Sequence, residues 1–232
     1  MSPKNNIHML EMVAKGLGKL KDEVVFVGGA VTSLYIDDKA APPVTASDDI
    51  DCVIQVASMN EYAKIEKILA KQGFKRPVDE EDQAIICRWD YFGILVDVMP
   101  TDEKILGFTN IWYSEAIKNK MTQELPNGTK ISIFTLPYFV ATKLEAFKGR
   151  GENDWRMSQD FEDIISVLDG CTTAEEQLKK VTGKLKTYFK KEFSQFTKDE
   201  SHLREAVEGF LRPSKSTTSR SKKVIQLIHS LT

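Results

Sequence analysis

The order of the secondary-structure patterns constrains the fold of this chain more than any other feature of its sequence. Up to about residue 135, short apolar runs typical of β-strands alternate with helical spacings, and from Pro137 onward every pattern is helical. Such an order predicts an α/β (α+β) protein, with a mixed sheet flanked by helices in residues 1–135 and a C-terminal helical domain in residues 136–232. Strands are expected at 23–27, 50–56 and 130–134 and in a hairpin within 84–100, and helices at 8–20, 59–74, 137–148, 158–169, 173–196, 200–211 and 221–231.

Composition indicates where in the cell this protein is expected and which kind of metal site it can form. No apolar run approaches the roughly 18 residues that a membrane span needs, and MSPKNNIHML lacks the layout of a signal peptide, so a cytoplasmic protein without a membrane partner is expected. The cysteines and histidines are few and scattered, which excludes a disulfide framework and a CxxC metal site. Any metal must then bind oxygen ligands, as Mg²⁺ or Mn²⁺ does. These residues are Cys52, Cys87, Cys171, His8, His202 and His229.

Three carboxylates interrupt stretches that otherwise read as buried strands. In VTASDDIDCVIQV, Asp49 and Asp51 share one face of a strand because side chains two residues apart point the same way. Asp97 lies within GILVDVMP, where an ionised carboxylate is costly unless something compensates it. Taken singly, Asp49 could cap a turn and Asp97 could pair with Arg88. Together, they indicate a site for divalent metal ions of the kind that phosphoryl transfer requires.

A glycine pair follows the first expected strand. Gly28 and Gly29 end VVFV, and a helix is expected immediately after them. Glycines allow the backbone to approach a ligand closely, and the N–H groups of a helix start bind phosphate. A tight turn without a ligand is the alternative interpretation.

A lysine and two aspartates stand out in the helical half. Lys143 lies on the apolar stripe of its helix, so it either extends along its stem to solvent or points its ammonium into a cleft toward an anion, and the cleft is favoured. In the next helix, Asp160 lies at the edge of the apolar stripe and is expected to pair with Lys143 or with a ligand. Interaction with the helix dipole is its alternative role. Asp163 is expected to face away.

These elements in this order resemble the nucleotidyltransferase superfamily of the DNA polymerase β type. Within it, FVGGAVTSLY, SDDIDCVI, VDVMP and ATKLEAFKGRGENDWRMSQDFEDI are similar to the AbiEii-type abortive-infection and toxin–antitoxin nucleotidyltransferases. The resemblance covers roughly residues 24–170. The segment between Gly29 and Asp49 is longer than is usual in the superfamily. The block ATKLEAFKGRGENDWRMSQDFEDI corresponds to the family pattern at Lys143, Ala146, Arg150, Asp160 and Asp163.

The resemblance implies the nucleotidyltransferase fold and a metal-dependent reaction that transfers NMP from an NTP to a hydroxyl group. Asp49, Asp51 and Asp97 would hold two Mg²⁺ or Mn²⁺ ions and carry the catalysis. Gly28, Gly29, Lys143 and Asp160 would bind the nucleotide. A cognate antitoxin protein is a further partner that toxin relatives imply.

The acceptor is expected to be RNA, such as a tRNA end. Two basic stretches motivate this expectation: residues 179–191, and the tail from Gly209, which has five cations and no acid. A solvated helix face and a loose tail are the simpler explanation. A small hydroxylated acceptor, as in antibiotic nucleotidyltransferases, and a non-catalytic nucleotide- or RNA-binding module on the same fold are the alternatives.

Overall fold

The protein divides into two compact units. The structure is a computed structural model that describes residues 5–78, 80–83, 85–150, 155–211 and 217–232. Unit 1 comprises Met1–Val31 and Thr45–Thr135, and unit 2 comprises Thr32–Val44 and Leu136–Thr232. Within the described residues, no helix has both the length and the apolar character that crossing a membrane would take.

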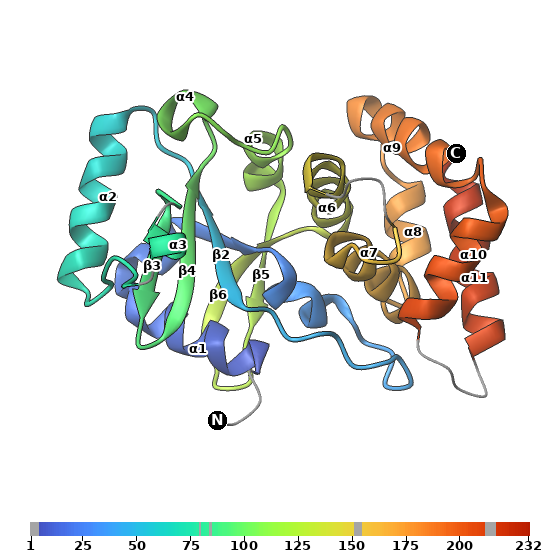
Figure 1. The fold of residues 1–232 in the computed structure, drawn as a ribbon, viewed down its shortest axis with the longest axis horizontal. Helices are drawn as coiled ribbons and strands as arrows, with labels where there is room; N and C mark the ends of the chain where they lie inside the picture. The colour runs from blue at the N-terminus through green and yellow to red at the C-terminus, as the bar shows by residue number, and fades with distance from the viewer. Residues whose placement is uncertain (1–4, 79, 84, 151–154, 212–216) are drawn as a thin grey trace. The chain divides into compact units, whose positions relative to one another are not determined.

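Unit 1 is built on a mixed six-stranded sheet of order β3-β4-β2-β1-β6-β5 (Figure 1). Strand β2 pairs with β4 in parallel and with β1 in antiparallel fashion, while β1 and β6 are parallel. The two outer strands, β3 and β5, are antiparallel to their neighbours. The strands are β1 (Val24–Val27), β2 (Asp49–Ile54), β3 (Arg88–Tyr91), β4 (Ile94–Pro100), β5 (Lys120–Glu124) and β6 (Lys130–Phe134).

The two longest helices of unit 1 begin after capping side chains. Helix α1 (Asn6–Leu17) starts after Asn5, whose side chain accepts hydrogen bonds from the first backbone N–H groups, and α2 (Met59–Lys71) starts after Ser58 in the same way. The hydroxyl of Tyr62 on α2 donates to the backbone carbonyl of Val98 on β4. The shorter helices are η1 (Gly18–Asp22), α3 (Glu80–Gln83), α4 (Glu103–Leu106), α5 (Tyr113–Ala116) and η3 (Ile117–Asn119), and η2 (Gly29–Tyr35) begins in unit 1 and ends in unit 2.

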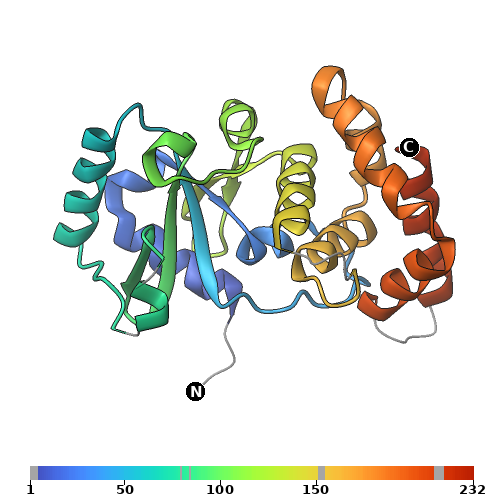
Figure 2. The same ribbon diagram turned by 45° about the horizontal axis from the view of Figure 1, so that its top comes forward.

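Unit 2 is helical throughout its described secondary structure (Figure 2). Its core is rich in phenylalanine. Phe139, Phe161, Phe189 and Phe193 are at most 2% exposed. The helices are α6 (Leu136–Arg150), α7 (Gln159–Gly170), α8 (Ala174–Lys179), α9 (Gly183–Phe196), α10 (Glu200–Phe210) and α11 (Thr217–Ser230). The predicted mixed sheet with helices, followed by a helical region, is therefore confirmed.

A divided helix and an additional strand are among the differences from the expected elements. The single helix expected at 173–196 is wrong: α8 ends at Lys179 and α9 begins at Gly183, whose φ of 62° places it in the left-handed region. The structure also contains β5, which the sequence pattern did not indicate. Only alternate residues of β5 are partly shielded, because it is the outer strand beyond β6.

Residues 32–44 join unit 2 through backbone and side-chain bonds. The N–H groups of Asp37 and Asp38 donate to the carbonyl of Gly170 at 3.1 and 3.0 Å. The carboxylate of Asp37 accepts from the backbone and the hydroxyl of Thr172, and Asp38 pairs with Arg220 at 2.8 Å. The acidic residues of this long segment therefore anchor it to the end of α7 and to α11.

Candidate metal centre

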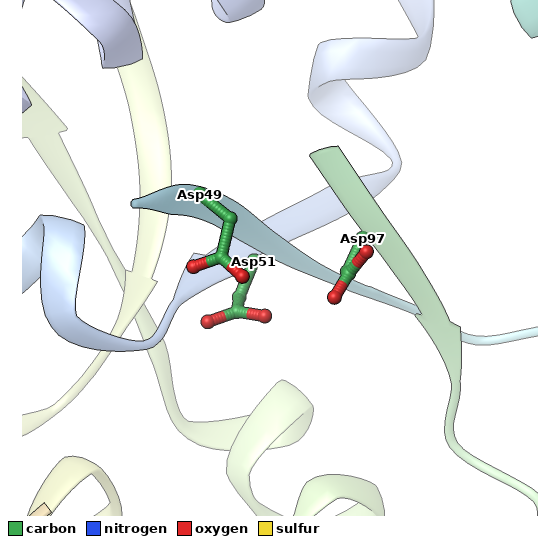
Figure 3. A group of neighbouring side chains, drawn as sticks. All are labelled: Asp49, Asp51 and Asp97. Carbon is green, nitrogen blue, oxygen red and sulfur yellow. The ribbon is translucent and has the colours of Figure 1, made fainter. Parts of the chain in front are cut away.

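Strands β2 and β4 bring the three predicted carboxylates together. In the parallel register, Asp51 lies opposite Asp97, and Asp49 lies two residues earlier on the same face of β2. Figure 3 shows the three side chains directed toward a common space, and one ligand atom from each lies within 4.8 Å of the others. Ile50 and Cys52, on the opposite face, are fully buried, so apolar packing anchors the strand that carries the acids.

A network of hydrogen bonds fixes the chain just before Asp49. The side chain of Asn6, at the start of α1, accepts a hydrogen bond from the backbone N–H of Ser47 at 2.8 Å and donates to the carbonyl of Thr45 at 3.3 Å. The hydroxyl of Ser47 in turn donates to Asp49 Oδ1 at 3.4 Å. Asn6 and Ser47 are both buried, so this network holds the beginning of β2 in place.

Gly28 makes room for the carboxylate of Asp51. Val27 lies opposite Asp51 in the antiparallel β1–β2 pair, and Gly28 follows with a φ of 73°. A Cβ atom added to Gly28 would lie 2.0 Å from Asp51 Oδ2, far closer than any real contact. The glycine is therefore required by the acidic cluster itself, a role that the sequence interpretation of a phosphate-binding turn did not include.

Replacing Gly28 by alanine is expected to displace the Asp51 carboxylate and weaken binding of Mn²⁺. The left-handed backbone alone costs a non-glycine residue about 1–2 kcal/mol, and overpacking against Asp51 adds a further ~1–3 kcal/mol. Urea denaturation and Mn²⁺ titration would measure the two effects.

Gly93→Ala is the matched control, because Gly93 has a φ of 80° and its added Cβ would meet nothing within 4 Å. This variant should show the backbone cost alone, with unchanged Mn²⁺ binding. Equal losses in both variants would contradict the steric role of Gly28.

Arg88 on β3 binds three carboxylates at once. Its Nε and Nη2 donate to the two oxygens of Asp97, Nη2 also donates to Asp49 Oδ2, and Nη1 donates to Asp82 Oδ1, all at 2.8 Å. The hydrogen bonds to Asp97 raise the pKa of Arg88 above its ordinary value. Burial, and next the charge of Asp97, raise the pKa of Asp49 above its usual value although Arg88 opposes them. The alternative that Asp97 pairs with Arg88 is thus confirmed as a contact.

The donor set fits a metal ion. Carboxylate oxygens are the ligands that hard divalent cations prefer, and mutually repelling carboxylates in one cluster need cations between them. Asp97 is 7% exposed, and Asp49 and Asp51 are partly exposed, so the cluster combines a buried side with access for ions. Asp49, Asp51 and Asp97 can therefore hold a metal ion.

Lys143 and Asp160 lie in unit 2, in a second charged cluster. The ammonium of Lys143 is 2.9 Å from Asp160 Oδ1 and 2.7 Å from Asp163 Oδ2, and the hydroxyl of Thr32 donates to Asp163 Oδ1 at 2.9 Å. Burial alone would lower the pKa of Lys143, but Asp163 and Asp160 raise it above its ordinary value. The expected pairing of Lys143 with Asp160 is confirmed.

The expectation that Asp163 faces away from the core is wrong. Asp163 is 3% exposed and is an ion-pair partner of Lys143. Residues three apart on a helix share a face, so Asp163 lies beside Asp160 on α7. The buried ammonium of Lys143 compensates both carboxylates, and the apolar stripe alone could not reveal this.

The remaining predicted residues have simpler surroundings. Gly29 begins the expected helix, which is the 3₁₀-helix η2. In the basic stretch 179–191, Lys179 and Lys180 pair with Glu175 and Glu176 one helical turn earlier, as in an ordinary solvated helix face. Lys184, Lys186 and Lys190 on α9 are exposed. The side chain of Arg150 and residues Arg212 and Lys215 of the basic tail lie outside the described part of the chain.

Comparisons with family models and with curated proteins found no match for this chain.

Proposed function

We propose that this protein is a metal-dependent nucleotidyltransferase that transfers NMP from an NTP to a hydroxyl group of RNA. The observation that carries the proposal is the convergence of Asp49, Asp51 and Asp97 from two neighbouring strands to within 4.8 Å. Three such carboxylates on a rigid sheet are suited to ligating metal ions and holding a transferable phosphoryl group in line with its acceptor. The resemblance of the sequence motifs to those of the DNA polymerase β superfamily supports the proposal by analogy.

In this proposal, the residues of unit 1 divide the chemical work. Bound Mg²⁺ or Mn²⁺ ions would neutralise the triphosphate and lower the pKa of the acceptor hydroxyl. Asp49, Asp51 and Asp97 would hold these ions, and Asp97 would also orient the hydroxyl and accept its proton. The hydroxyl oxygen forms a bond to the α-phosphorus while the bond from that phosphorus to the bridging oxygen breaks, and pyrophosphate leaves.

The nucleotide-binding roles of the other predicted residues are part of the proposal. The backbone amides of Gly28 and Gly29 would approach the phosphates. Lys143, whose ammonium pairs with Asp160 and Asp163, would contribute positive charge to phosphate binding. Asp160 would fix the direction of that ammonium rather than contact the nucleotide itself.

RNA is proposed as the acceptor because unit 2 exposes lysines on α9 and α11. Lys184, Lys186 and Lys190 extend over about two turns of α9, and Lys222 and Lys223 are exposed on α11. Phosphate backbones bind such cations, and this binding weakens steeply with salt.

The proposal predicts label transfer to RNA. The protein would be incubated with Mg²⁺, cellular RNA and each α-labelled NTP in turn, beside an Asp49→Asn/Asp51→Asn variant whose fold is checked by circular dichroism. We expect wild type to label RNA with at least one NTP and the double variant to lose the labelling. Labelling that persists in the double variant would contradict the metal site.

A separate variant tests whether RNA is the acceptor. Replacing Lys184, Lys186 and Lys190 together by glutamine should reduce RNA labelling and flatten its dependence on salt. Label on a small hydroxylated molecule, with none on RNA, would overturn RNA as the acceptor while retaining the transferase.

A further inference from the structure

The guanidinium of Arg88 lies between two of the three carboxylates of the metal centre. Its Nη2 contacts both Asp49 Oδ2 and Asp97 Oδ2 at 2.8 Å, so a single NH₂ group of the guanidinium bridges the two strands of the site. Nε binds the remaining oxygen of Asp97. The arginine side chain is only 13% exposed, which leaves it shielded among these acids.

The carboxylate oxygens that face Arg88 are those that a metal ion needs. Both oxygens of Asp97 and one oxygen of Asp49 accept hydrogen bonds from Arg88, and the other oxygen of Asp49 accepts from Ser47. A divalent ion bound to Asp49 and Asp97 would therefore lie close to the guanidinium, and like charges repel strongly at such short distances. The ion and the arginine cannot both hold these oxygens at full strength.

Arg88 also has a carboxylate partner outside the metal centre. Its Nη1 donates to Asp82 on the short helix α3, and the Asp82 side chain is 28% exposed. An arginine that released Asp49 and Asp97 would keep this carboxylate as a partner, so its charge would not be left without compensation.

The balance of charge also depends on Arg88. Asp49, Asp51, Asp97 and Asp82 together carry −4 when ionised, and Arg88 reduces this to −3. One divalent ion would leave −1, and a second would give an excess of positive charge, which the negative charge of a triphosphate would offset.

We propose that Arg88 competes with the metal ions for Asp49 and Asp97, so that the centre is filled tightly only when a nucleoside triphosphate brings its negative charge. This inference rests on the metal centre of the proposed function and adds to it an order of binding. Arg88 is thus a positioning residue that keeps the carboxylates paired until the substrate arrives.

Binding of Mn²⁺ alone to the full chain tests this competition without any turnover. Mn²⁺ would be titrated, without nucleotide, into wild type, Arg88→Gln, Arg88→Met and Arg76→Gln, and followed by calorimetry and electron paramagnetic resonance. Arg88→Gln keeps amide donors for Asp97 but removes the charge. Arg76 is the matched control, because its guanidinium pairs with Glu66 and lies over Trp89 instead of on the acidic cluster.

We expect both Arg88 variants to bind Mn²⁺ at least tenfold more tightly than wild type and Arg76→Gln. Unchanged or weaker binding by folded Arg88 variants would overturn the competition while leaving the metal centre intact. An Asp51→Asn variant tests whether Mn²⁺ binds at the acidic cluster, because it removes one of the three carboxylates. If wild type, the Arg88 variants and Asp51→Asn all fail to bind Mn²⁺, the metal centre itself is refuted, and the proposed function with it.

A second pair of variants does not require the loss of Arg88. Asp82→Asn removes the alternative partner of the guanidinium, whereas Asp48→Asn removes a carboxylate next to Asp49 in the chain. If Asp82 receives the displaced arginine, Asp82→Asn should weaken Mn²⁺ binding more than Asp48→Asn does. An equal or smaller effect of Asp82→Asn would overturn the proposed displacement.

Discussion

Replacing Lys143 by methionine is expected to destabilise the protein by about 3–5 kcal/mol, because breaking a buried ion pair leaves uncompensated charge in the interior. Asp160 and Asp163 are 7% and 3% exposed, and Lys143 is the ion-pair partner of both. Methionine fills a similar volume, so the loss reports charge rather than a cavity. Urea denaturation followed by circular dichroism would measure it.

Lys148→Met is the matched control on the same helix. Lys148 also pairs with two carboxylates, Glu145 and Glu192, but its side chain is 39% exposed, so a loss of about 1 kcal/mol or less is expected. Adding Asp163→Asn to Lys143→Met should recover part of the lost stability. Similar losses for the two lysines would show that the buried cluster has no special role.

The pKa of Lys143 gives the pH dependence of the same cluster. Because this pKa lies above its ordinary value of 10.5 in the folded protein, the stabilisation is fully present below pH 10.5. This stabilisation is lost as the pH rises through the raised pKa of Lys143. Wild type should therefore lose stability at alkaline pH more steeply than Lys143→Met does.

Asp97→Asn is expected to lower NMP transfer by at least about 10³-fold. Removing one charge-stabilising group from an active site commonly costs ~10²–10³ in rate, and the proposed proton acceptor is lost as well. The amide also places N–H donors against Arg88, so the metal centre loses both charge and geometry. Initial rates of label transfer at saturating NTP would measure the effect.

Asp22→Asn controls for the general loss of an acid from unit 1, since Asp22 is largely exposed and lies against Lys21. This variant should transfer NMP at the wild-type rate. Thermal melts must show Asp97→Asn to be folded at the assay temperature. A folded Asp97→Asn protein with more than a tenth of wild-type activity would contradict the assigned role.

The sequence predicted the parts of the site that depend on local periodicity. The alternation of side chains along a strand was enough to place Asp49 and Asp51 on one face. That β2 and β4 are neighbours, with Asp51 opposite Asp97, depends on strand order, which periodicity does not contain. The contact of Arg88 with Asp49 depends on this same long-range pairing, whereas its contact with Asp97 arises within the β3–β4 hairpin.

Local patterns were least informative where pairing or burial is decided at a distance. The sequence KMTQE forms β5 because β6 provides a ladder for it, and an outer strand needs little apolar character. The break before α9 had a visible signal in Gly183. Asp163 also had one, since its spacing of three from Asp160 places both on the same helical face.

The course of the chain between its two units limits how this protein can be divided. The polypeptide passes from one unit to the other after Val31, after Val44 and after Thr135. Residues 32–44, with Asp37 and Asp38 bound at the end of α7, thus belong to unit 2 although they lie within the first 135 residues. Neither unit is a continuous stretch of sequence, so recombination at a single crossover cannot exchange one unit for that of another protein.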